Sequence, residues 1–170
     1  PMGWLFVKRR MASELSQDWL KNFREFDKEA TRAASLGQVH KAVLNNSETV
    51  ACKLQYPDMQ SAIQADLRQL KLLFQLYERY DSAISTSDIY DELSERLYEE
   101  LDYRREAQNM QLYRYKLANE SCVVVPQHRP ELSTERLLTM NWLDGTRLMP
   151  FLGTNPDQDT RNKIARHMFR

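Results

Sequence analysis

Residues 38–54 read QVHKAVLNNSETVACKL, and this stretch decides the fold. Apolar and polar residues alternate with a period of two on both sides of Asn45-Asn46-Ser47, which is the pattern of two β-strands joined by a turn. Asparagine tolerates the positive φ that such turns need. Pro57 ends the second strand because proline has no backbone N–H to donate to a sheet. The stretch therefore predicts an antiparallel β-hairpin.

Amphipathic helices are predicted on both sides of the hairpin. Apolar residues recur every three or four positions between residues 4 and 26, and again after Asp58, so each segment is predicted to form a helix. The second of these carries the stripe Ile63, Leu67, Leu70, Leu73, Leu76 and Tyr77. A third helix is expected to begin at Thr86 or Ser87 as N-cap and to reach about Leu117. Its apolar stripe is Leu93, Leu97 and Leu101.

Two more strands and one more helix are predicted after residue 119. One strand covers Cys122 to Val125 and the other runs from Arg136 to Met140. Pro156-Asp157 then opens a last helix. The order of helix, hairpin, two long helices, two strands and helix predicts an α+β fold with an antiparallel sheet and helices on one side.

The composition is that of an ordinary globular domain. The chain has 170 residues, of which 42% are hydrophobic and 28% charged, enough for one sizeable core. Lysine plus arginine equal aspartate plus glutamate at 24 each, so no net field favours nucleic acid and no nucleic-acid partner is expected. Lys8-Arg9-Arg10 is interpreted as a solvated helix face. No apolar run is long enough to span a bilayer.

The cysteines and histidines do not predict a metal site. Cys52 and Cys122 lie inside apolar runs far apart in the sequence, and we expect both to be buried free thiols. The histidines are mutually distant and none has a ligand spacing: His40, His128 and His167.

Three segments carry residues suited to phosphate chemistry. Lys53 lies in the middle of an apolar strand, where its ammonium either pairs with a carboxylate or phosphate or keeps its head in water at a strand edge. Residues 31–40, TRAASLGQVH, are at the right distance before Lys53 to be a loop over nucleotide phosphates, although small residues also serve tight packing. Residues 99–106, EELDYRRE, put Asp102 and Glu106 one helical turn apart, although acid clusters are usually solvated.

Four strings occur together in the order and spacing of the UbiB (AarF) family of atypical kinases. They are AASLGQVH, VACKLQYP, ELDYRREA and LLTMNWLDG. The chain resembles this family over essentially its whole length. The resemblance implies a protein-kinase-like N-lobe, with long helices inserted into the antiparallel sheet. Residues 1–28 would form an N-terminal helical segment, 29–149 the N-lobe, and 150–170 the truncated start of the C-lobe.

The same resemblance assigns the phosphate side of a nucleotide site. Lys53 would orient the α and β phosphates, and Glu106 would hold it, so nitrogen and oxygen should approach within about 4 Å. The Leu93, Leu97 and Leu101 stripe lies opposite Glu106 on an ideal helix, so the helix should kink near Asp102 or pack on two sides. The alanine-rich loop over the phosphates would consist of Arg32, Ala33, Ala34 and Ser35. Arg32 departs from the family's alanine.

The resemblance also assigns an adenine side and an acidic element. Met140 would line the adenine pocket, while the Asn141 carbonyl and the Leu143 amide would hydrogen-bond adenine. Asn141 stands where the family usually has glutamate. Glu100 and Asp102 would contact a family-specific N-terminal extension that would precede Pro1, so we expect both carboxylates to be exposed and under-partnered.

For function, the resemblance implies ATP or ADP with magnesium as cofactors and an atypical kinase or ATPase that supports ubiquinone (coenzyme Q) biosynthesis. It would act on the cytoplasmic or mitochondrial-matrix side, peripheral to the inner membrane, with ubiquinone-biosynthesis proteins or membrane lipids as further partners. The family's catalytic and metal-binding aspartates would follow Arg170, so this chain alone should bind nucleotide weakly and not turn it over. The alternative is a helical protein- or lipid-interaction module without a nucleotide role.

Overall fold

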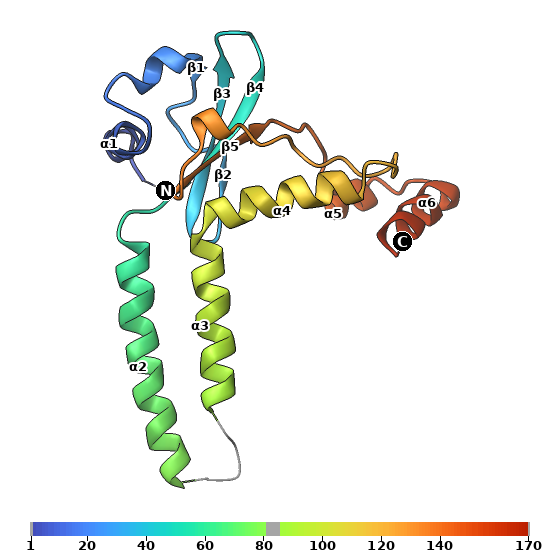
Figure 1. Ribbon diagram of the computed structural model, residues 1–170. Coiled ribbons are helices and arrows are strands. Elements are labelled where there is room, and N and C mark those ends of the chain that lie inside the picture. The colour runs from blue at the N-terminus through green and yellow to red at the C-terminus, as the bar shows by residue number, and fades with distance from the viewer. Residues whose placement is uncertain (1, 81–85, 170) are drawn as a thin grey trace.

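A computed structural model describes residues 2–80 and 86–169, and it confirms the predicted α+β class (Figure 1). The helices are α1 (Trp4–Glu14), α2 (Met59–Tyr80), α3 (Ser87–Leu101), α4 (Tyr103–Lys116), α5 (Leu148–Gly153) and α6 (Gln158–Met168), with the short 3₁₀ helices η1 (Trp19–Asn22) and η2 (Pro130–Leu132). The strands are β1 (Phe23–Phe26), β2 (Arg32–Ala33), β3 (Gly37–Leu44), β4 (Thr49–Gln55) and β5 (Leu137–Asn141).

The sheet is antiparallel and runs in the order β1-β3-β4-β5, with β2 pairing on the start of β3. The predicted hairpin forms its centre, because β3 and β4 pair from Gly37 opposite Gln55 to Val43 opposite Thr49. The positive φ of the turn falls on Ser47, at 71°, and not on an asparagine. Asn46 serves the turn differently, since its Oδ1 accepts a hydrogen bond from the Glu48 amide.

One face of the sheet forms the main hydrophobic core. Along β3 the residues alternate between buried and half-buried, so one set of side chains points into this core and the other toward the opposite face. The core joins the sheet to α1 and η1 through Val7, Met11, Trp19, Phe23, Ala42, Leu44, Val50, Cys52, Leu54, Leu132 and Leu137. The opposite face carries the half-buried Val39, Lys41 and Lys53.

The predicted helix from residue 4 to 26 is wrong in its second half. The helix α1 ends at Glu14, and the chain continues through η1 into β1, which pairs with β3. Apolar residues do recur through this segment, but its backbone turns from helix to strand after η1. The strand forms because β1 then supplies hydrogen-bond partners to the edge of β3. Trp19 and Phe26 pack edge to face with ring centroids 4.9 Å apart, an arrangement that stabilises this corner.

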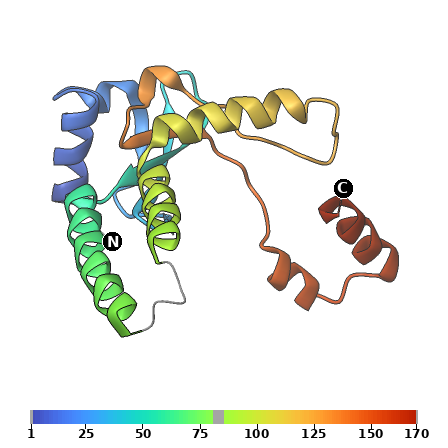
Figure 2. The same cartoon turned by 60° about the horizontal axis from the view of Figure 1, so that its bottom comes forward.

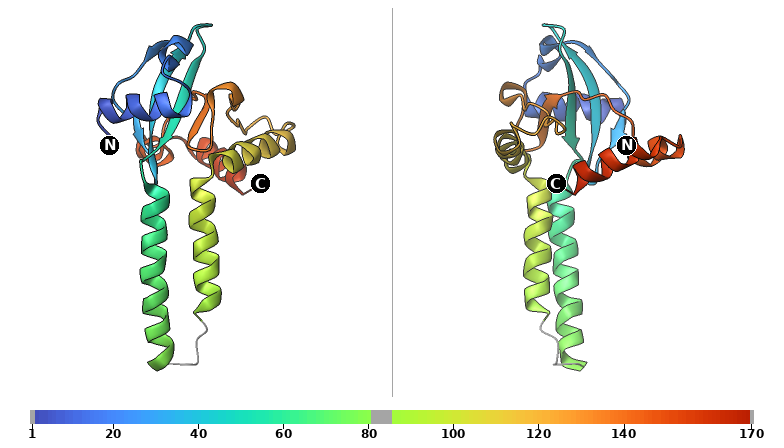
Figure 3. Two further views of the ribbon diagram at one scale, coloured as in Figure 1. Left: turned by 60° about the vertical axis from the view of Figure 1, so that its left-hand side comes forward. Right: turned by 90° about the vertical axis from the view of Figure 1, so that its right-hand side faces the viewer.

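The helices α2 and α3 form a hairpin that projects from one end of the sheet (Figure 3). Near the sheet they pack through Ile63, Leu67 and Leu101. Further out, large apolar side chains of both helices are exposed: Leu72, Leu73, Leu76, Tyr77, Ile89 and Leu93. No helix within the described ranges is long and apolar enough to cross a membrane.

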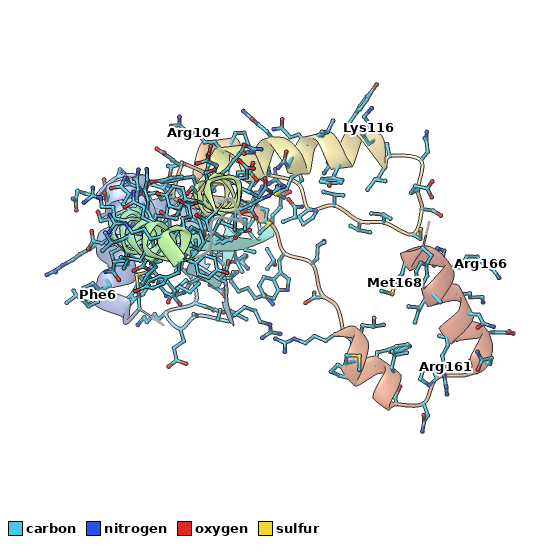
Figure 4. The ribbon with its side chains drawn as sticks, turned by 90° about the horizontal axis from the view of Figure 1, so that it is seen from below. Phe6, Arg104, Lys116, Arg161, Arg166 and Met168 are labelled. Carbon is cyan, nitrogen blue, oxygen red and sulfur yellow. The ribbon has the colours of Figure 1, made fainter. Side chains whose placement is uncertain are left out.

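The expected irregularity near Asp102 is confirmed as a complete break. The helix α3 ends at Leu101 and α4 begins at Tyr103, with Asp102 in extended conformation between them. The helix α4 then runs across the end of α3, with Arg104 at the sheet end and Lys116 at the far end (Figures 1 and 4). The break lets the leucine stripe of α3 face α2, while α4 packs its own apolar positions against Leu138 of β5. Because α1 packs on the other face of the sheet, helices lie on both sides, and the prediction that they lie on one side is wrong.

The predicted strand at residues 122–125 does not form. These residues are irregular, Val124 is 70% exposed, and Cys122 is exposed, so its predicted burial is wrong, whereas Cys52 is buried as expected. After this segment, His128 forms an isolated bridge with Met140 of β5. Pro126 has no backbone N–H to donate, so the pairing with β5 does not extend back toward Cys122.

The last two helices stand apart from the sheet. Figures 2 and 4 show α5 and α6 at the end of an extended connection, away from the strands. Asp157 caps α6 by accepting a hydrogen bond from the Thr160 amide, as the Pro156-Asp157 pair predicts. The helix α5 was not predicted.

A buried hydrogen-bond chain ties the N-terminal segment to the sheet. The His40 Nε2 lies 2.8 Å from the Gln38 Nε2, and the His40 Nδ1 lies 2.8 Å from the Asp27 carbonyl oxygen. The Gln38 Oε1 accepts from the Met2 amide at 2.6 Å. Since the Gln38 amide nitrogen and the Asp27 carbonyl have fixed roles, His40 must be neutral with its proton on Nδ1.

Acidification is therefore expected to destabilise the chain. Burial lowers the pKa of His40 below its ordinary 6.5, although the Asp27 carbonyl opposes the shift. The unfolded chain then takes up a proton first, so the free energy of unfolding should fall as pH drops through about 6.5. Urea denaturation at several pH values measures this, and His40→Asn should flatten the slope. An unchanged slope in that variant would contradict the role of His40. The pH dependence would then be assigned to His128, whose pKa is also lowered by burial.

Candidate functional site

The face of the sheet opposite the main core, here called the open face, carries side chains of β3, β4 and β5 in register. Lys53 of β4 lies between Val39 of β3 and Leu138 of β5. One step further along, Ala51 lies between Lys41 and Met140. Because residues two apart on a strand share a face, these two rows place two lysines, Lys41 and Lys53, beside apolar side chains.

Lys53 forms an ion pair with Glu106 of α4, as predicted. Its Nζ lies 2.7 and 2.9 Å from the two carboxylate oxygens, inside the expected 4 Å, although 53 residues separate the two in the chain. The lysine side chain is 17% exposed and the glutamate side chain 38% exposed, so the pair is sheltered on the lysine side and open to solvent on the other. A hollow of about 320 Å³ adjoins the pair.

Glu106 reaches Lys53 because of how α4 begins. Asp102 is the N-cap, and its Oδ1 accepts hydrogen bonds from the Arg104 and Arg105 amides at 3.0 and 3.2 Å. Glu106 lies in the first turn, where a negative charge also suits the helix dipole. The backbone of the same turn is tied down, because the Tyr103 amide donates to the Glu135 carbonyl.

The expectation that Glu100 and Asp102 are exposed and under-partnered holds only for Glu100. Glu100 is exposed and accepts one hydrogen bond from the Ser35 hydroxyl, at 3.2 Å. Asp102 is half-buried and serves as the cap described above, so the prediction is wrong for this residue. The reason is the break between α3 and α4, which creates free amide groups that need an acceptor.

The loop residues assigned to phosphate come close to this acidic end. Arg32 and Ala33 form the short strand β2, paired with Val39 and Gln38. Ala34 donates its amide to the Gly37 carbonyl, which closes the turn. The Arg32 guanidinium is exposed and donates to the Thr31 carbonyl. The loop therefore lies at the same end of the sheet as Glu100.

The residues assigned to adenine lie at the end of β5. Met140 is half-buried on the open face, opposite Ala51. The Asn141 amide donates to the Gln127 carbonyl, and its side-chain Oδ1 is buried without a hydrogen-bond partner among the described residues. Leu143 lies past the strand and is 46% exposed. Met140 thus shares the face of Lys53, whereas Leu143 extends into the connection toward α5.

Comparison with known proteins identifies the family. The sequence model of the ABC1 atypical kinase-like domain matches residues 1–170. The chain belongs to the ABC1 atypical kinase-like family. It is 32% identical to the atypical kinase COQ8, mitochondrial, of Saccharomyces cerevisiae over 96% of this chain, and 33% identical to the atypical kinase COQ8B, mitochondrial, of Rattus norvegicus over 98%.

A solved structure has the same fold. The complex of Rv3197 with erythromycin from Mycobacterium tuberculosis matches 88% of this chain with a TM-score of 0.77 and 29% sequence identity. The chain spans 38% of that protein, and 32% and 31% of the yeast and rat relatives. This ABC1 chain therefore corresponds to about a third of the proteins it resembles.

Sequence reasoning missed one residue in contact with the candidate site, Tyr103. Its ring lies under the lysine, with the Lys53 Nζ 4.7 Å from the ring centroid. A signal was present, because Tyr103, Ala107 and Met110 form an apolar stripe at helical spacing that begins after Asp102. Reading the acidic segment as one continuous helix hid that stripe.

The described side chains around Lys53 and Glu106 do not form a metal-ion site. Among residues 2–80 and 86–169, no three His, Cys, Asp or Glu side chains are grouped in a way that could hold a metal ion.

Removing the Asp102 cap is expected to lower the free energy of unfolding by about 1 kcal/mol, the usual cost of losing an N-cap acceptor. Asp102→Ala leaves the Arg104 and Arg105 amides without their acceptor. Asp102→Ser keeps an acceptor and should recover most of the loss. Urea denaturation of the three proteins provides the measurement, and an alanine variant as stable as wild type would show that the cap is dispensable.

Proposed function

We propose that this chain is the nucleotide-binding lobe of an atypical kinase or ATPase, and that it takes ATP or ADP together with Mg²⁺. The observation that carries the proposal is the two-oxygen ion pair of Lys53 with Glu106 at the centre of the open face. A lysine held in this way by a helix glutamate is the group that orients the α and β phosphates in protein kinases.

The surroundings of the pair supply the other contacts that a nucleotide needs. Val39, Ala51 and Met140 form an apolar patch beside Lys53, suited to a flat base. The loop from Arg32 to Ser35 would offer the phosphates the exposed Arg32 guanidinium and backbone amides other than that of Ala34, which donates to the Gly37 carbonyl. Mg²⁺ bound with the nucleotide would offset the charge of the phosphates. Glu106 keeps the ammonium in place before the ligand arrives, so less side-chain freedom is lost on binding.

The wider role is proposed from the relatives. By analogy with its kinase relatives, the whole protein would be an enzyme that supports ubiquinone biosynthesis. It would act at the cytoplasmic or mitochondrial-matrix face of an inner membrane. Its partners would be biosynthetic proteins or membrane lipids. We expect this chain alone to be inactive, because phosphoryl transfer also requires a metal-binding aspartate and an aspartate that orients the acceptor. The resemblance assigns both to positions after Arg170.

A second candidate function rests on the far part of the α2–α3 hairpin. Exposed apolar side chains such as Leu72, Leu76 and Tyr77 lie there. Grouped exposed apolar side chains, unlike single ones, are typical of surfaces that bind a partner. They favour a helical module that docks a partner or a lipid surface without any nucleotide role.

Calorimetry with ADP and Mg²⁺ tests the proposal. The wild-type chain should bind with a Kd near 1 mM, about −4 kcal/mol, since one lobe buries only part of the ligand. Lys53→Met should weaken binding at least tenfold, because it removes the cation that meets the phosphates. The matched control is Lys71→Met, a lysine that also lies over an aromatic ring but on α2. Equal binding by wild type and Lys53→Met would refute the nucleotide role.

A further inference from the structure

Among the described residues, Tyr103 is the largest of the fully buried side chains. It is 1% exposed and packs with Ala107 of its own helix and Leu138 of β5, with Met140 against the same cluster. The Lys53 Nζ lies 4.7 Å from its ring centroid. The ring therefore contacts the lysine, the helix of Glu106 and the strand that ends in the adenine-side residues.

The phenol hydroxyl adds a second observation. It is buried and has no hydrogen-bond partner among the described residues, which is costly for a polar group. Burial, and then the nearby charges of Glu106 and Glu100, raise the pKa of Tyr103. The phenol thus stays protonated and cannot pair with Lys53 as a phenolate. What faces the ammonium is the neutral aromatic ring, whose negative face attracts cations.

We propose that Tyr103 is a positioning residue that holds the Lys53 ammonium in place through its ring. Glu106 fixes the ammonium from one side with two hydrogen bonds, and the ring limits its movement on another. An aliphatic side chain of similar volume would fill the same space but would not attract the charge. Glu106 contacts only the ammonium end of the side chain, so a second contact further limits the conformations open to the four-carbon lysine stem.

The hydroxyl extends this arrangement to the phosphate loop. A Cβ added to Gly37 would lie 3.1 Å from the Tyr103 hydroxyl oxygen, so the phenol lies directly beside the backbone where the loop enters β3. One side chain thus contacts the loop end and the lysine, the two elements that would meet phosphates. The effect of Tyr103 on nucleotide affinity rests on the function proposed above, whereas its hold on Lys53 does not.

The hold on Lys53 can be measured without nucleotide. In the wild-type chain the Lys53 Hε protons should be shifted upfield by the ring current, compared with those of the exposed Lys163. Tyr103→Phe should keep that shift and Tyr103→Leu should abolish it. Tyr103→Phe should also be at least as stable as wild type, since it removes an unpaired buried hydroxyl. An unshifted Lys53 in the wild-type spectrum would overturn the proposal even if Tyr103→Leu failed to fold.

A double-mutant cycle separates positioning from packing. Unfolding equilibrium constants are compared for wild type, Tyr103→Leu, Lys53→Met and the double variant. A cation held over a ring predicts a coupling of about fivefold. Additive effects would show that Tyr103 serves packing alone and would overturn the proposal. Lys71→Met with Tyr90→Leu is the matched cycle for an aromatic contact outside the site.

Nucleotide binding gives the third readout. Tyr103→Leu should weaken ADP binding about three- to tenfold, the cost of ordering one freed side chain, while Tyr103→Phe should bind like wild type. A shifted, coupled Lys53 in a chain that binds no nucleotide would contradict the proposed function but leave the positioning role of Tyr103 intact.

Discussion

Gly37→Ala is expected to lower the free energy of unfolding by about 2–3 kcal/mol, at the upper end for an overpacked site. A Cβ at this position would lie only 2.4 Å from the Leu54 carbonyl oxygen and 3.1 Å from its carbonyl carbon. Both atoms belong to the backbone of the neighbouring strand, which cannot rotate away as a side chain would. The start of β3 and the end of β4 must therefore separate, close to Lys53.

Urea denaturation of Gly37→Ala beside Gly153→Ala tests this expectation. A Cβ at Gly153 meets nothing within 4 Å, so that variant should stay within about 0.5 kcal/mol of wild type. Equal stability of the two variants would mean that the strands at Gly37 can move apart at little cost.

Glu106→Leu is expected to lower the free energy of unfolding by about 1–2 kcal/mol. It leaves the Lys53 ammonium, 17% exposed, without its carboxylate. Full burial of an unpaired charge would cost about 3–5 kcal/mol, but the 38% exposure of Glu106 lets water replace part of the lost interaction.

The double variant Lys53→Met with Glu106→Leu supplies the decisive comparison. Removing both charges should restore most of the stability, because an ion pair adds little over apolar side chains of similar volume. If the double variant is as unstable as the sum of the two single variants, the pair does not act as a unit.

The central part of the fold could be predicted from the sequence. Residues 38–54 carry a period of two and a turn, and nothing in the surrounding structure competes with that pattern. The N-terminal segment was harder to predict from the sequence. The spacing of Trp19, Phe23 and Phe26 fits one face of a helix, and it fits equally well an aromatic cluster beside a strand. Pairing with β3 decides between the two, and pairing is not visible locally.

The other misses have related physical causes. Cys122 to Val125 is a strand by composition, but it finds no neighbour to pair with and remains irregular. The break at Asp102 was foreseen from the conflict between the leucine stripe and Glu106, although not its completeness. The cap role of Asp102 depends on that completeness, since an acceptor is needed only where a helix begins.

The candidate site could be predicted in part. Lys53 and Glu106 came from family resemblance, since the residues alone favoured a strand-edge lysine with its head in water. Tyr103 was not predicted, because its importance arises from a contact across the break and not from a motif. The nucleotide roles remain predictions for all the assigned residues: Lys53, Glu106, Arg32, Ala33, Ala34, Ser35, Met140, Asn141 and Leu143.

An NMR titration of the chain with ADP and Mg²⁺, followed through the backbone amides, tests nucleotide binding on the open face most directly. We predict saturable shifts in the millimolar range at Gly37, Lys53 and Met140, together with the loop from Arg32 to Ser35, and none on the far part of the α2–α3 hairpin. Shifts confined to that hairpin, or no saturable shifts at all, would contradict the account.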